Sequence, residues 1–255
     1  MDGPIFGACA LLSALTSALC LYVTLRRRHR PDYRLARSAR TVASLSACIG
    51  SLLAIPIVAD AVDRMTGCNE LATLSSDLAA VVFCAGLQVM VVDWRHPRER
   101  INASVTKRVA ALGAVVVLLI WEFQRIDRAH FDLSPVDGRD RQVTVYLLTY
   151  LAFSTVAALE VGTVSAFLAR RTWLRGHASA VGLGICAAGA AFGLAYAVSR
   201  GGYLVAVHTG HTWPAYVESG ISPVLAGLCI GGVTIGLSLA TVSADADRRT
   251  SGRRS

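Results

Sequence analysis

One acidic residue, Glu160, lies in the middle of a long apolar run and is the strongest candidate for chemistry in this chain. The run covers residues 151–169 and is followed by Arg170. At about 1.5 Å per helical residue, Glu160 would lie roughly 15 Å from that end, near the middle of a bilayer. An ionised carboxylate there is costly unless it faces a partner or water. Two interpretations stay open: Glu160 binds a proton or a cation, or it is a neutral carboxyl that bonds to a Ser, Thr or Tyr of a neighbouring helix.

Two further acids, Asp77 and Asp60, lie inside apolar segments near the opposite end. Asp60 is about one turn inside its predicted helix, and Asp77 lies about 10 Å below the start of the next one. With Glu122 and Glu218, which are predicted near the same interface, they could line an outward vestibule that attracts cations, metals or amines. The alternative is a set of exposed interfacial acids, with Asp60 paired to Arg64.

Three basic or imidazole side chains are predicted on this same outer side. Arg200, at the outer end of the sixth predicted helix, could neutralise an acid or bind an anionic group, or it could extend to the interface by snorkelling. His208 and His211 are three residues apart, but a metal ion needs at least a third ligand. The sequence therefore predicts no metal site and no cofactor.

Enzyme chemistry has no recognisable motif here. We find no glycine-rich phosphate loop, no zinc-protease motif, no nucleophile elbow and no dinucleotide fingerprint. The single lysine, Lys107, is predicted near the inner end of the fourth helix, which excludes a retinal Schiff base in the seventh. The seven cysteines show no metal-ligand spacing. We expect a protein that is not an enzyme.

The elements that must position these residues are membrane helices. Of the 255 residues, 54% are hydrophobic and 16% are charged, whereas a soluble domain carries about a quarter charged residues. A bilayer core about 30 Å thick requires roughly 20 apolar residues in a helix. Seven segments fit, although the fourth is short: about 4–25, 41–62, 71–93, 108–123, 143–169, 178–199 and 219–243.

The distribution of basic residues predicts the orientation. Nineteen of the 25 Lys and Arg residues lie on the side of the loop at 26–40, and six lie on the other side. Because basic residues are retained in the cytoplasm, the amino terminus is predicted outside and the carboxyl terminus inside. The net charge of +8 then indicates contact with anionic inner-leaflet lipids and no nucleic acid. The prediction is an all-α polytopic bundle at 1–243 with a disordered basic cytoplasmic tail at 244–255.

Several local signals predict how the second and third helices meet. Pro56 is expected to kink the second helix, and Gly67 supplies a permissive backbone just past its end. Asn69 is the expected N-cap of the third helix, with Glu70 in its first turn.

Two segments of the later helices carry further signals. Gly189 and Gly193 have the spacing of a close-packing motif between membrane helices. Residues 201–208 could extend the sixth helix or form a re-entrant piece, and composition leaves both open.

The run VDRMTG at 62–67, followed by NELA at 69–72, resembles the pattern in a family of actinobacterial multi-pass membrane proteins catalogued as transporters. That resemblance covers the membrane region and implies a transporter, but it assigns no residue a role. Many members continue into a cytoplasmic carboxyl-terminal domain, which is expected to be absent here. Arginine outnumbers lysine 24 to 1, which indicates a GC-rich bacterial genome and hence a bacterial cytoplasmic membrane.

Two functions therefore stay open at the level of sequence. The first is a transporter, or a transporter subunit, for a small solute or ion that uses Glu160, Asp77 and Asp60. The second is a membrane sensor or scaffold that passes an extracellular signal to a cytoplasmic protein partner through the basic loops. The buried Glu160 favours the first, and the short inner segments favour the second. The sequence predicts no oligomeric state.

Overall fold

The computed structural model is an all-helical bundle and describes residues 2–26, 34–95, 98–126, 141–174, 179–214 and 216–251. Residues 27–33, 96–97, 127–140 and 175–178, which belong wholly or mostly to predicted loops, and the tail residues 252–255 lie outside this part. The elements are α1 (Asp2–Arg26), α2 (Arg34–Leu53), α3 (Pro56–Thr66), α4 (Leu71–Arg95), α5 (Arg98–Arg125), α6 (Arg141–Trp173), α7 (Ser179–His208), the short π-helical turn η2 (Val217–Ile221) and α8 (Ser222–Ser251).

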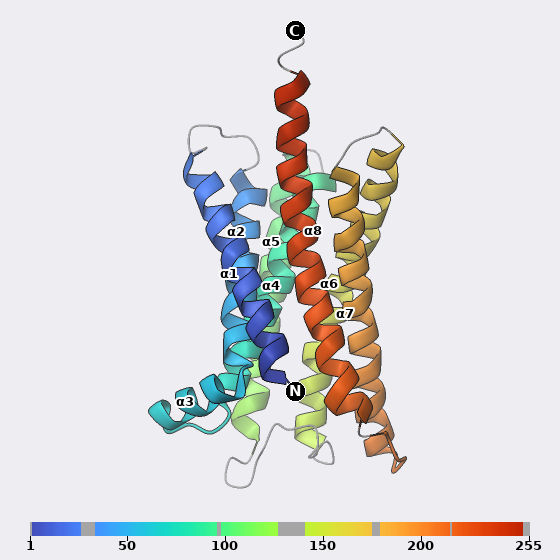
Figure 1. Cartoon of the computed structure of the whole chain (residues 1–255). Helices are drawn as coiled ribbons and strands as arrows, with labels where there is room; N and C mark the ends of the chain where they lie inside the picture. Colours follow the sequence, from blue (N-terminus) through green and yellow to red (C-terminus); the bar gives the residue numbers. More distant parts are fainter. Residues whose placement is uncertain are drawn as a thin grey trace.

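The helices are long and apolar enough to form a membrane bundle. Within the described residues, six of them qualify as membrane spans on their own, and the bent pair α2–α3 raises the number to seven. The chain is therefore a multi-pass integral membrane protein. In Figure 1 the long helices run side by side, and α1 begins at the end of the bundle opposite to the one where α8 ends.

The order of packing makes a ring with one helix outside it. Helix α1 packs on α2, α2 on α4, α4 on α6, α6 on α7, α7 on α8, and α8 returns to α1. Helix α5 packs on both α4 and α6, and only 6% of its apolar window is buried in the bundle, against 56% for α4. Helix α4 is thus the central element, and α5 is a peripheral one.

Pro56 breaks the second predicted helix instead of kinking it. Helices α2 and α3 meet at 84°, Pro56 is the first residue of α3, and Ile55 before it has an extended backbone (φ −78°, ψ 121°). A proline disfavours helical geometry in the residue before it and cannot donate the hydrogen bond that would continue the helix. The prediction of one helix over 41–62 was therefore wrong. In Figure 1, α3 lies crosswise at the end of the bundle where α1 begins.

The turn into α4 is capped by Asp63. Its carboxylate oxygens accept hydrogen bonds from the backbone N–H groups of Glu70 and Ala72, at 3.0 Å each. Glu70 itself has φ 61° and precedes the helix, so the predicted roles of Asn69 as N-cap and of Glu70 in the first turn were wrong. Gly67 ends α3 with φ 66°, as predicted.

Other helix ends also differ from the sequence expectation. Helix α5 begins at Arg98 and not near residue 108, so part of the predicted basic loop is helical. Helix α7 continues through His208, which settles residues 201–208 as an extension of that helix. Helix α8 continues through Ser251, where a disordered tail was predicted from residue 244. Extending an existing helix is far easier than nucleating a new one, which accounts for all three extensions.

Helices α7 and α8 approach each other through glycines. A methyl group at Gly189 would lie 2.6 Å from the backbone nitrogen of Val233, and one at Gly193 would lie 2.7 Å from Sγ of Cys229. Methyl groups at Gly182 of α7 and Gly236 of α8 would meet backbone atoms of the facing helix. The close packing predicted for Gly189 and Gly193 is confirmed.

We predict that Gly189→Ala destabilises the bundle. The added methyl group would meet the backbone of α8, which cannot move aside as a flexible side chain can, so we expect the free energy of unfolding to fall by about 1–3 kcal/mol. The measurement is the midpoint of thermal unfolding in detergent. The matched control is Gly184→Ala on the same helix, where nothing lies within 4 Å, and helix propensity alone would then raise stability by up to about 1 kcal/mol. Equal midpoints for the two variants would contradict the close approach.

Candidate functional site

Glu160 is paired with a basic residue inside the membrane-spanning region. Its Oε1 accepts a hydrogen bond from Nη2 of Arg108 on α5, and the two side chains form a salt bridge. Its Oε2 accepts a hydrogen bond from Nε2 of Gln88 on α4 at 3.1 Å. All three residues lie inside candidate membrane spans. We call Glu160, Arg108 and Gln88 the inner centre.

The inner centre joins three helices far from their ends. At about 1.5 Å per residue, Arg108 lies about 15 Å into α5 from Arg98, and Gln88 lies about 10 Å from the end of α4 at Arg95. Gln88 is buried, whereas the side chains of Arg108 and Glu160 keep 23% and 21% of their surface exposed. The bundle therefore encloses Gln88 fully and the two charged groups only in part.

Asp77 forms a second polar centre nearer the other end of α4. Its Oδ2 accepts a hydrogen bond from the hydroxyl of Tyr146 on α6 at 2.8 Å, and Tyr146 is fully buried. Arg200 on α7 acts electrostatically on the carboxylate of Asp77 and on Tyr196. Of the three roles predicted for Arg200, neutralising an acid is the one this position supports. We call Asp77, Tyr146 and Arg200 the outer centre.

Helix geometry places both centres along the interface of α4 and α6. Asp77 and Gln88 are eleven residues apart, which is close to three full turns and about 16 Å on one face of α4. Cys84 of α4 and Ser154 of α6 lie against each other between the two centres. The interface thus carries polar groups at three successive levels.

Of the four acids predicted to line a vestibule, Asp77 and Glu122 both lie near Tyr146, whereas Asp60 and Glu218 belong to other elements. Asp60 is exposed on α3, and Nε of Arg64 donates to its backbone oxygen and not to its carboxylate. Glu122 is buried on α5 and accepts a hydrogen bond from Thr149 at 3.2 Å. Glu218 lies in η2. Among the residues that the structure describes, no group of three or more His, Cys, Asp or Glu side chains is placed to hold a metal ion.

Sequence reasoning missed Arg108, Gln88 and Tyr146. Arg108 was counted with the basic loop because it follows Lys107. The available signal was the length of the fourth predicted segment, which is too short to cross a bilayer unless the helix begins earlier and takes Arg108 inside. Gln88 was a second signal, because an amide within an apolar membrane helix needs a partner.

Searches of protein-family models, of curated proteins and of solved structures found no significant match for this chain. The functional argument therefore depends on the geometry of its own residues.

We predict that Glu160→Gln destabilises the protein more than the double variant Glu160→Gln/Arg108→Gln. Removing one member of this part-buried pair leaves the other charge uncompensated, at a cost below the roughly 3–5 kcal/mol of a fully buried pair, whereas removing both leaves no charge behind. The measurement is unfolding in detergent for the wild type, both single variants and the double variant.

The control for this cycle is Asp60→Asn, which removes an exposed carboxylate and should leave the midpoint unchanged. If the two single-variant costs simply add in the double variant, Arg108 and Glu160 do not compensate each other.

Proposed function

We propose that this protein is a transporter for a small solute or ion and that the inner centre is its binding site. The observation that carries the proposal is the ion pair of Arg108 and Glu160 within the spans. Two apolar side chains of similar size would stabilise the bundle as well or better. Ionisable groups that face the interior of a membrane bundle mark substrate or ion pathways far more often than they serve packing.

The position of α5 supports the proposal. This helix lies outside the ring, and little of its apolar surface is buried. Its polar link to the ring is the ion pair with Glu160, together with the interaction of Glu122 and Thr149 near its other end. Protonation or ligand binding at the inner centre would change how α5 is held. A transporter needs such an element with two arrangements of similar free energy.

The outer centre supports a route that continues toward the other end of the bundle. Asp77 lies on the same face of α4 as Gln88, and Cys84 and Ser154 lie between the two levels. A polar route within the bundle is what an ion or a small polar solute requires, since the hydrocarbon around it offers no hydrogen bonds.

Transport can be tested in proteoliposomes that contain the purified protein. We expect that at least one member of a panel of small carboxylates, amines and inorganic ions produces uptake or a transient current on a solid-supported membrane. In Glu160→Gln and Arg108→Lys this signal should fall at least about tenfold, which corresponds to about 1.4 kcal/mol. Lys107→Gln, which changes an exposed charge on the same helix as Arg108, is the matched control and should keep the signal. Equal signals in all four proteins would remove the inner centre from the transport function.

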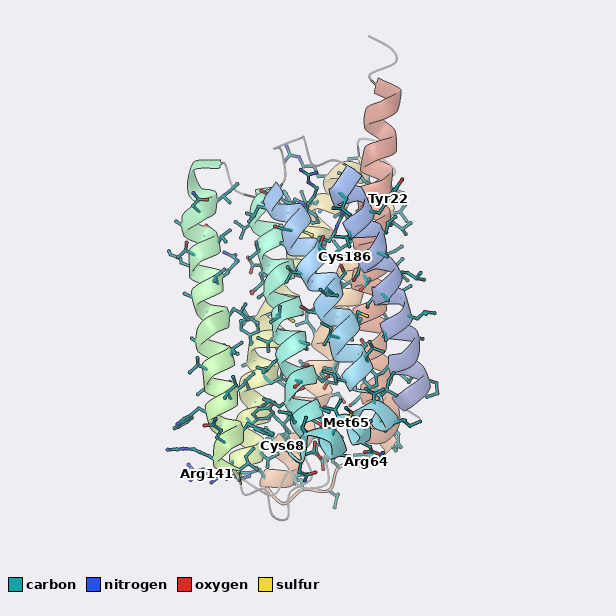
Figure 2. All side chains as sticks on the ribbon, turned by 90° about the vertical axis from the view of Figure 1, so that its left-hand side faces the viewer. Tyr22, Arg64, Met65, Cys68, Arg141 and Cys186 are labelled. Atoms are coloured by element: carbon teal, nitrogen blue, oxygen red, sulfur yellow. The ribbon has the colours of Figure 1, made fainter. Side chains whose placement is uncertain are left out.

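The proposed orientation places the amino terminus outside, in a bacterial cytoplasmic membrane. Cys68 follows α3 at the end of the bundle opposite Tyr22 (Figure 2), and its side chain is partly exposed. The other six cysteines lie in the helices that form the bundle. An impermeant maleimide should therefore label Cys68 in intact cells, and Cys68→Ser should abolish that labelling. Labelling that requires permeabilised cells would reverse the orientation.

A further inference from the structure

We propose that Arg108 and Glu160 form a site that takes up one proton and one small carboxylate anion together. Glu160 accepts the proton, Arg108 is released from the ion pair, and its guanidinium binds the anion. This inference specifies the ligand class of the proposed transport site and rests on that function. It has three supports: the donors around the pair, the kind of cation that the site can accept, and the charge balance inside the bundle.

One N–H donor of Arg108 has no hydrogen-bond partner. Its Nη2 donates to Glu160, and its Nη1 donates to the backbone oxygen of Ser104 at 3.3 Å. Its Nε is buried and has no hydrogen-bond partner. A guanidinium presents parallel N–H groups that match the two oxygens of a carboxylate. The free Nε–H, together with the Nη2–H that Glu160 would release, supplies such a pair of donors.

The groups around Glu160 select a proton over a metal cation. Helix α5 contributes the positively charged Arg108, and α4 contributes an N–H donor from Gln88. On α6 itself, Thr163 donates to the backbone oxygen of Glu160. Helix α7 packs against the neighbouring turn of α6 through Ala190, which faces Gly162. Metal cations such as Ca²⁺ need six or more oxygen ligands, whereas a proton needs a single carboxylate oxygen.

Charge balance couples the two ligands. The ion pair is neutral as a unit. A proton alone would leave an uncompensated guanidinium, and an anion alone would leave an extra negative charge, and either is costly in a low-dielectric interior. With both bound, a neutral Glu160 stands beside an Arg108–carboxylate pair, and the site is neutral again. Each ligand therefore strengthens the binding of the other, and this coupling is reciprocal.

The test measures binding directly, apart from transport. The purified protein in detergent is titrated with sodium acetate, sodium lactate and sodium benzoate at pH 5.5 and pH 7.5, with sodium chloride and ethylamine as comparisons. Calorimetry reports affinity, and a pH indicator in weak buffer reports protons. We expect one proton taken up per anion bound, and an affinity that rises up to about tenfold for each unit that the pH falls.

Two variants give opposite expectations. Glu160→Gln imitates the protonated carboxyl, so it should bind the anion at both pH values with the same affinity and without proton uptake. Arg108→Lys keeps the charge but loses the fork of donors, so its affinity for the anion should fall at least about tenfold. The double variant Glu160→Gln/Arg108→Gln removes both charges and should bind none of the three anions. If one of the single variants does not fold, the double variant still tests whether the two charges are needed for anion binding.

Four results would overturn the inference. In the wild type, these are anion binding that does not depend on pH and is not accompanied by proton uptake, or no binding of any of the three carboxylates at either pH. In the variants, they are loss of anion binding in a folded Glu160→Gln, or anion binding that persists in the double variant. The proposed function fails separately. Coupled binding without flux in proteoliposomes would remove transport and leave the site, whereas flux of a cation without anion binding would remove the site and leave transport.

Discussion

A charge inside an apolar helix bundle has to be compensated, and this constraint determines how α5 joins the molecule. Helix α5 buries little of its apolar surface, and its apolar contacts with the bundle run from Val105 through Leu112 to Leu119 and Phe123. Between Val105 and Leu112, the ion pair of Arg108 with Glu160 adds a polar attachment to these apolar ones. The same contact therefore holds a peripheral helix in place and concentrates charge at a single level of the bundle. A change in protonation at that level acts on the packing of a whole helix.

The remaining helix contacts are of a different kind. Helices α7 and α8 meet backbone to backbone at Gly189 and Gly236, and α4 meets α2 closely at Gly86, where a methyl group would lie 2.9 Å from Cβ of Ala43. Such contacts allow little sliding, because any displacement forces backbone atoms together. The pairs α7–α8 and α2–α4 are thus the tightly packed parts of the bundle. Helix α5 has no such glycine contact among its described residues, and its attachment to α4 and α6 combines apolar packing with the polar pairs of Arg108 and Glu122.

The sequence predicted the helical class and the approximate position of most of the spans, because long apolar runs and basic flanks act locally. It also identified Gly67 and the glycines of α7, whose roles follow from local backbone geometry. It did not predict the 84° break at Pro56, since a proline kinks or breaks a helix according to what the next turn packs against. It missed the Asp63 cap and the partner of Glu160, which is 52 residues away in the chain. Such pairings are decided by how the helices assemble, and no local pattern records that assembly.

The neutrality of the inner centre limits what can be bound there. In the described structure, Glu160 is already satisfied by Arg108 and Gln88, so a cation has to displace a bond before it gains one. A lone cation would compete with the guanidinium of Arg108 for the carboxylate of Glu160. It would also face the N–H donors of Arg108 and Gln88, whereas a cation needs oxygen lone pairs. A lone anion would compete with Glu160 for Arg108 and leave that carboxylate unpaired. Only species whose charges cancel can replace the internal pair without leaving a net charge in the interior. The requirement follows from the ion pair and holds whichever face of the membrane the ligand enters from.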